Sequence, residues 1–201
     1  MKLTPFVFAF IGLTSLAQAH LHTYTADLSG LNEAVPNASP GIGFSTVTLD
    51  LDLITMQVEV DFSDLLGVTT AAAIHGATTF PFTGTAGPMS PPLAATGFPL
   101  GVTAGSYDHT FDLTDAPGYS PSFITASGGT VGDALNALAF SFEDGTAYLS
   151  IQSSAFPGGE IRAFYTEVSE VPEPSTWLFA LPALVGGSLR LRQRRHEVVA
   201  G

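Results

Sequence analysis

Two neighbouring runs of alternating polar and apolar residues constrain the fold of this chain most strongly. In the run 44–51 the side chains of Val47, Leu49 and Leu51 share one face, and in the run 56–62 every second residue is again apolar. Successive side chains of a β-strand point to opposite faces, so each run predicts a strand with one buried face. Residues 52–55 predict the turn between them, and the two strands are expected to form an antiparallel hairpin.

The rest of the central region predicts further strands and one helix. Strand-like runs rich in Thr, Val, Leu and Phe occur at 22–28, 70–78, 106–113, 147–153 and 160–168. Between 131 and 142, apolar residues recur at helical spacing. Five prolines in 80–103 predict a long surface excursion without regular pairing, because proline has no N–H to donate to a ladder. The prediction is an all-β domain over 20–168, an antiparallel β-sandwich or barrel with one short helix.

Charge is divided unevenly along the chain. Of the 18 acidic residues, 17 lie between Asp27 and Glu173, where Arg162 is the one Lys or Arg. A negative field of this kind repels nucleic-acid phosphates, so DNA or RNA is not an expected partner. The chain has no cysteine, which excludes disulfides and thiolate metal sites.

The first 19 residues have the three parts of a secretory signal peptide. Lys2 gives a basic start, 6–16 is an apolar run, and Ala17 and Ala19 form a small-x-small cleavage site. The run is too short to span a bilayer, which takes roughly 20 residues. The pattern predicts export by Sec-type machinery, cleavage by signal peptidase after Ala19, and a mature chain that begins at His20.

Histidines and paired carboxylates are the candidate metal ligands. An N-terminal His20 would offer its α-amine and its imidazole to copper, and His22, His75 and His109 are the other histidines of the central region. The alternative is that these side chains serve the fold, His75 as a hydrogen-bonded, partly buried imidazole. The pairs Asp50/Asp52 and Asp61/Asp64 offer oxygen ligands to calcium or are simply solvated charges, and no EF-hand loop is present.

Three sequence blocks resemble the CHRD domain, which is named for chordin and occurs in many exported bacterial proteins. The blocks are 28–36, 72–76 and 148–162, and the resemblance spans about residues 21–166. The last block carries the most specific string, Gly-Gly-Glu-Ile-Arg, and only His75 remains of the histidine positions usual in the family. The residues that match the family motif are His75, Gly76, Gly158, Gly159, Glu160 and Arg162.

Arg162 is the candidate binding residue of that motif. Alternation in the last strand places it on the same face as Glu160. An arginine among carboxylates makes bidentate hydrogen bonds, so Arg162 either ties the last strand to neighbouring acidic groups or binds a substrate. No nucleophile or phosphate-binding motif accompanies it.

The C-terminal tail, 169–201, resembles a PEP-CTERM sorting signal. A short motif is followed by an apolar segment, 175–189, and then by basic residues; these are Val171, Pro172, Glu173, Pro174, Ser175, Arg190, Arg192, Arg194 and Arg195. The resemblance implies transient insertion, cleavage by an exosortase-like protease, and delivery to the cell surface or extracellular matrix of a Gram-negative bacterium. The arginines favour a cytoplasmic end. Fifteen residues span about 22 Å, short of a hydrocarbon core, and a permanent anchor is the alternative.

These features lead to one functional prediction with two alternatives. We expect a non-enzymatic, exported binding or scaffolding module without a cofactor, whose partner is a matrix polysaccharide or a surface protein. The first alternative is a copper- or zinc-dependent secreted protein that uses the four histidines. The second is a calcium-assisted adhesion module that uses the acidic loops.

Overall fold

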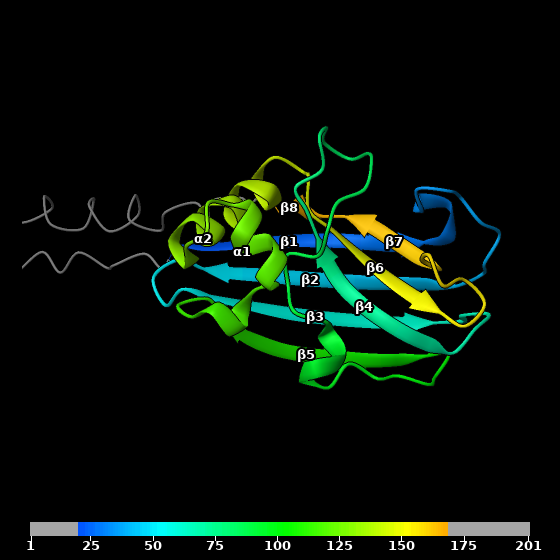
Figure 1. The fold of residues 1–201 in the computed structure, drawn as a ribbon. Coiled ribbons are helices and arrows are strands. Elements are labelled where there is room, and N and C mark those ends of the chain that lie inside the picture. The colour runs from blue at the N-terminus through cyan, green and yellow to red at the C-terminus, as the bar shows by residue number, and fades with distance from the viewer. Residues whose placement is uncertain (1–19, 169–201) are drawn as a thin grey trace, which may run out of the picture. The chain divides into compact units, whose positions relative to one another are not determined.

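The computed structural model describes residues 20–168, which form a curled antiparallel sheet with helices at one end (Figure 1). The strands are β1 (Leu21–Ser29), β2 (Ile42–Asp50), β3 (Thr55–Ser63), β4 (Thr69–His75), β5 (Gly105–Asp112), β6 (Tyr148–Ser153), β7 (Ile161–Phe164) and β8 (Thr166–Glu167). The helices are η1 (Gly30–Asn32), η2 (Leu93–Thr96), η3 (Ala116–Gly118), α1 (Pro121–Ala126) and α2 (Val131–Glu143).

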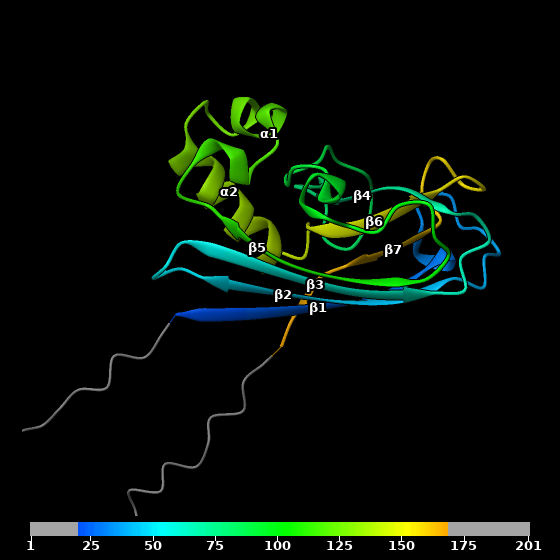
Figure 2. The same ribbon diagram turned by 90° about the horizontal axis from the view of Figure 1, so that it is seen from below.

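The sheet follows the order β4-β6-β7-β1-β2-β3-β5, and β8 pairs with β1 beside β7. Its pairs are antiparallel, and β4 and β5 end the path without pairing with each other. Figure 2 shows the sheet curling over, so that β4 and β6 lie above the strands of the other half. A mostly β, antiparallel domain is thereby confirmed, but its single sheet forms a half-barrel rather than the predicted sandwich or barrel.

The predicted hairpin is formed by β2 and β3. Val47 lies opposite Val58, and Leu49 lies opposite Met56; all four side chains are buried. Leu51 is the exception, because β2 ends at Asp50 and places Leu51 in the turn, where it is 41% exposed. The alternation therefore predicts the hairpin and its buried face correctly, but it places the strand end and the turn one residue too late.

The predicted helix is α2, and it closes one end of the half-barrel. The Thr130 side chain accepts a hydrogen bond from the Asp133 N–H (3.1 Å), which caps the first turn. Leu138 and Phe142 are buried against the core, and the Phe142 ring lies 5.1 Å from those of Tyr24 and Tyr165. The helix therefore packs on the inner face of the sheet near β1. The short helix α1 was not predicted.

Residues 88–103, the covering segment, occupy the gap between β4 and β5. The prediction of a long excursion with little regular pairing was made for 80–103, and no strand lies there. The covering segment is not confined to the surface, however, since Met89, Leu93 and Phe98 are buried. Backbone bonds attach it to β4: the Met89 N–H donates to Ile74 O (2.8 Å), and the Gly101 N–H donates to Thr69 O (2.9 Å). The segment thus supplies the apolar cover that an open half-barrel requires.

Candidate functional site

Arg162 lies at the centre of the candidate site, on the face of β7 that points away from the hydrophobic core. It is paired with Ser150 of β6 and with Ser29 of β1. Its side chain is 4% exposed and its Cζ atom lies 4.4 Å from the ring centre of Tyr148 and 4.9 Å from that of Phe164. Aromatic faces attract a cation, so the two rings hold the guanidinium in place.

No carboxylate of residues 20–168 forms an ion pair with Arg162, and its Nε atom is buried without a hydrogen-bond partner. The predicted tie to acidic groups through bidentate bonds is therefore wrong. Its reason is local: β7 begins at Ile161, and the Glu160 carboxylate, expected to share the face of Arg162, is engaged by two other loops. A buried charge without a partner is costly, which distinguishes Arg162 from an ordinary structural arginine.

Glu160 is a structural anchor. It is fully buried, and its Oε1 accepts from the Ser39 hydroxyl (2.6 Å) and the Leu66 N–H (2.5 Å), while Oε2 accepts from the Gly67 N–H (3.3 Å). Burial opposes ionisation, but hydrogen bonds from Ser153, Ser39 and the two amides outweigh it and lower the pKa of Glu160. The carboxylate therefore joins the β1–β2 and β3–β4 loops to the start of β7.

Glu33 lines the same cavity as Arg162, and the charge of Arg162 acts on its carboxyl group. The sequence analysis did not single it out. It follows η1, is 9% exposed, and accepts from the Ser150 hydroxyl (3.3 Å). Burial raises its pKa, although Arg162, the Ala34 N–H and the Ser150 hydroxyl oppose the rise. Glu33 belongs to the first family block and contacts Gly159 of the last one. Only the knowledge that these two blocks meet in the fold could have identified it.

The glycine at position 159 of the last block has a physical explanation. Its φ angle is +129°, and a Cβ atom built there would lie 2.5 Å from Oε1 of Glu33. Glycine is therefore required for two reasons. Its φ angle is one that other residues rarely adopt, and the Glu33 carboxylate fills the space that a Cβ atom would need. Gly158 meets no such neighbour within 4 Å.

His75 and Gly76 hold the loop after β4 on the outer face. The His75 ring stacks on Tyr148 (4.9 Å between centres, 7° between planes), and its Nδ1–H donates to Ala86 O (3.1 Å). Burial chiefly, with a contribution from the charge of Arg162, lowers the pKa of His75, while the bond to Ala86 opposes the shift. A Cβ on Gly76 would lie 2.8 Å from Sδ of Met89. His75 is thus a hydrogen-bonded structural imidazole.

The four candidate metal-binding histidines do not gather. His20 contacts Asp52, and His22 contacts Glu167, each at 3.2 Å, whereas His75 and His109 lie on β4 and β5 at opposite ends of the sheet order. Within residues 20–168, no group of three or more His, Asp or Glu side chains is placed to hold a metal ion.

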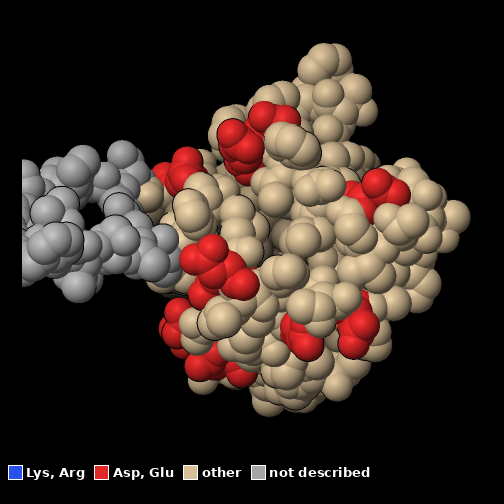
Figure 3. Space-filling model, turned by 90° about the vertical axis from the view of Figure 1, so that its left-hand side faces the viewer, with Lys and Arg blue, Asp and Glu red and all other residues tan. Residues whose placement is uncertain are grey.

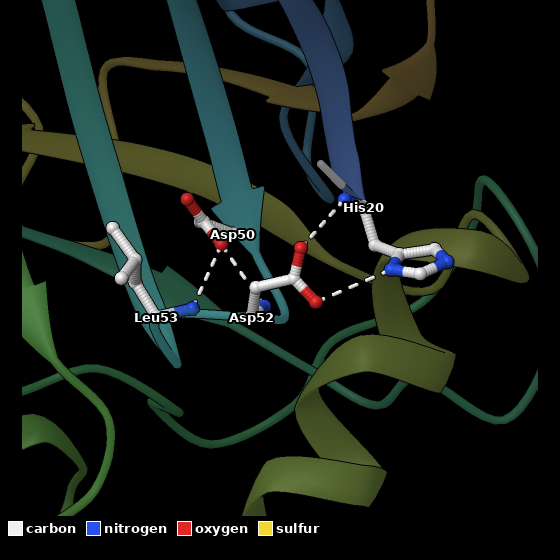
Figure 4. A network of polar contacts seen from close by, with 4 residues as sticks. All are labelled: His20, Asp50, Asp52 and Leu53. Carbon is white, nitrogen blue, oxygen red and sulfur yellow. Dashed lines mark hydrogen bonds and ion pairs between the residues drawn. The ribbon is translucent and has the colours of Figure 1, made fainter. Parts of the chain in front are cut away.

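The acidic pairs also have local partners. Figure 4 shows His20 and Asp52 facing one another beside the β2–β3 turn, where Oδ1 of Asp50 accepts from the Asp52 and Leu53 N–H groups (2.9 Å each). Asp64 accepts from the Ser63 hydroxyl (2.9 Å). The Asp50 carboxylate thus caps the β2–β3 turn, and on the face drawn in Figure 3 carboxylates are spread without a visible Lys or Arg.

Two cavities meet on the outer face of the sheet. The Arg162 cavity (about 690 Å³) is lined by the β1 and β7 strands, by the loop after η1 and by Phe82 to Gly84. The second, the Phe44 cavity (about 690 Å³), lies over β1, β2 and β3. Asp27 and Asn32 line both, so the two cavities adjoin, and together they are termed the outer groove. Each cavity lies in the size range of ligand sites.

The curled sheet brings Glu33, His75, Gly159, Glu160 and Arg162 of the three sequence blocks to one place in a mostly β domain. The chain matches the CHRD domain over residues 24–165 and belongs to that family. No curated protein and no solved structure matches the chain. The motif residues therefore have to be interpreted from their contacts in this protein.

The predicted targeting features lie outside the described residues. The cleavage site at Ala17 and Ala19, the motif 171–175, the apolar segment 175–189 and the terminal arginines all fall in 1–19 or 169–201. Among residues 20–168, none of the helices has the length and apolar character needed to cross a membrane.

Proposed function

We propose that this protein is an exported binding or scaffolding module, delivered to the cell surface or extracellular matrix of a Gram-negative bacterium. The order of its segments supports this proposal: a leader over 1–19, a CHRD domain, and a sorting-type tail over 169–201. Sec-type machinery, signal peptidase and an exosortase-like protease are the partners that this order requires.

The observation that carries the binding role is the outer groove. It crosses β7, β1, β2 and β3, and its lining combines the buried Arg162 with exposed carboxyl, amide and aromatic groups. Gly159, a residue of the family motif, leaves room for the Glu33 carboxylate, and Glu33 lines the groove. A rigid sheet that carries such a groove suits recognition of an extended partner.

Mass spectrometry of the terminal peptides tests the delivery scheme. Protein recovered from the medium and surface fractions should begin at His20 and lack the tail beyond the motif 171–175. A variant with Pro172, Glu173 and Pro174 changed to alanine should keep its tail and stay with the membrane. A wild-type chain that retains Met1 and the complete tail in the cytoplasm would contradict the proposal.

A further inference from the structure

The guanidinium of Arg162 is the one strongly polar group in the described part of the chain whose partners the fold does not supply. Arg162 is 4% exposed and lines the Arg162 cavity. Its Nε atom is buried and has no hydrogen-bond partner. The rings of Tyr148 and Phe164 cover its faces but accept no conventional hydrogen bond. The Nε atom is itself buried, so a ligand that brings hydrogen-bond acceptors can meet Arg162 only through the part of its side chain that lines the cavity.

The charge around Arg162 argues against an anionic ligand. Glu33 and Asp27 line the same cavity, so its acidic groups outnumber its one cation. The surrounding domain is also strongly acidic, and a field of that sign repels a polyanion before it reaches the cavity. The ligand must accept from the guanidinium and also donate to carboxyl groups, which hydroxyl groups do.

The groove lining combines polar groups with an aromatic ring, which matches the hydroxyl and C–H groups of a sugar. Thr25, Asn32 and Thr166 offer polar groups, whereas the Phe82 ring is 58% exposed and meets Phe164 edge-on with 6.2 Å between centres. A phenyl face packs against the C–H groups of a sugar ring, and the polar groups bind its hydroxyls. The second cavity continues the site past Asp27 to the half-exposed Phe44, so a chain of several units fits better than a single small molecule.

We propose that the outer groove binds a neutral polysaccharide chain, with one sugar unit held between Arg162, Glu33 and Phe82. This inference rests on the proposed binding function and names the class of its ligand. The sugar hydroxyls accept from Arg162 and donate to Glu33 and Asp27. Binding brings hydrogen-bond acceptors to the part of the guanidinium that lines the cavity.

Calorimetric titration of the exported protein tests this ligand class. The probes are neutral hexasaccharides with glucose, galactose or mannose units, and a galacturonic acid hexamer as the charged counterpart of the galactose hexamer. At least one neutral probe should bind with a Kd tighter than about 1 mM, little changed between low and high salt. The galacturonate hexamer should bind at least about tenfold more weakly than the best neutral probe. Failure of all neutral probes, or tighter binding of the galacturonate, would overturn the proposal.

Variants at exposed positions locate the site without disturbing the core. Phe82→Ala removes the aromatic wall, and Thr83→Trp fills the exposed mouth; each should weaken the best neutral probe at least about tenfold. Phe140→Ala is the matched control, since Phe140 is similarly exposed (61%) but lies on α2 outside the groove, and it should leave the affinity unchanged. Unchanged affinity in both groove variants would also overturn the proposal.

Arg162→Gln should abolish binding while the circular dichroism spectrum stays native-like. The terminal peptides of the same samples separate the two proposals. A protein that is exported and trimmed but binds no neutral sugar refutes the ligand assignment alone. A protein that binds sugar but keeps its leader and tail in the cytoplasm refutes the delivery scheme alone.

Discussion

Replacement of Glu160 should be among the most damaging substitutions outside the apolar core. Glu160→Ala leaves the Gly67 and Leu66 N–H groups and the Ser39 hydroxyl without their shared acceptor. A buried donor left unsatisfied costs about 1–3 kcal/mol. Water can reach part of this loop, because Leu66 is 59% exposed, so the low end of the range applies to each donor. The expected loss is about 3 kcal/mol in the free energy of unfolding.

Urea denaturation of the purified protein measures this loss. In a separate thermal unfolding experiment, a change of about 3 kcal/mol should lower the Tm by roughly 6–12 °C for a chain of this size. Glu160→Gln keeps the shape and one acceptor oxygen, so it should lose about half as much. Glu59→Gln, an exposed carboxylate on β3, is the matched control and should change little. A loss below about 1 kcal/mol in Glu160→Ala would refute the anchoring role.

The stabilisation from Glu160 should also depend on pH. Its folded pKa is lowered, so the carboxylate stabilises the protein fully above the unfolded value of about 4.3 and loses this contribution as the pH falls through the folded pKa. The difference between the wild type and Glu160→Gln should therefore be constant from about pH 5 to 8 and shrink in more acidic solution. A difference that does not change with pH would contradict the charge-assisted bonds.

Three further predictions concern neighbouring positions. Gly159→Ala should destabilise the protein by about 1–3 kcal/mol because of its positive φ and the Glu33 carboxylate, whereas Gly158→Ala should be tolerated; denaturant midpoints decide, and equal midpoints would refute the argument. Thr130→Ala removes the cap of α2 and should cost about 1 kcal/mol, measured in the same way; no loss would show that the cap is dispensable. His75 has a lowered folded pKa, so it remains neutral where the unfolded chain takes up a proton. Stability should fall as the pH drops below about 6.5, and less steeply in His75→Gln; parallel slopes would exclude His75 as the source.

Local patterns predicted the parts of the fold that depend on local chemistry. The alternation at Val47, Leu49, Met56 and Val58 predicts the hairpin and its buried face, and the spacing of buried residues predicts α2. The covering segment was predicted only as irregular chain. Its burial depends on the curl of a sheet whose end strands are 30 residues apart in sequence, from His75 at the end of β4 to Gly105 at the start of β5. No periodicity within the segment reports that.

The sequence predicted which residues form the candidate site, but not which partners each of them contacts. The family blocks point to Arg162, Glu160, Gly159 and His75, and the structure brings these residues near one another. Strand alternation wrongly joined Glu160 to Arg162, because the donors that bind the Glu160 carboxylate come from loops about 95 and 120 residues earlier. Glu33 was missed for the same reason: its burial is created by Gly159, 126 positions further along the chain.

The pairing of β8 with β1 has a mechanical consequence. Tyr24 lies opposite Glu167, and the Val168 N–H donates to Thr23 O (2.8 Å), so the described chain enters and leaves the sheet side by side. Tension between these two ends acts across the ladder and opens its bonds one after another, as in unzipping. Tension between residue 168 and a ligand in the outer groove instead runs along β1 and loads the bonds together. A domain tethered at residue 168 would therefore resist drag on its ligand better than it resists a pull on its two ends.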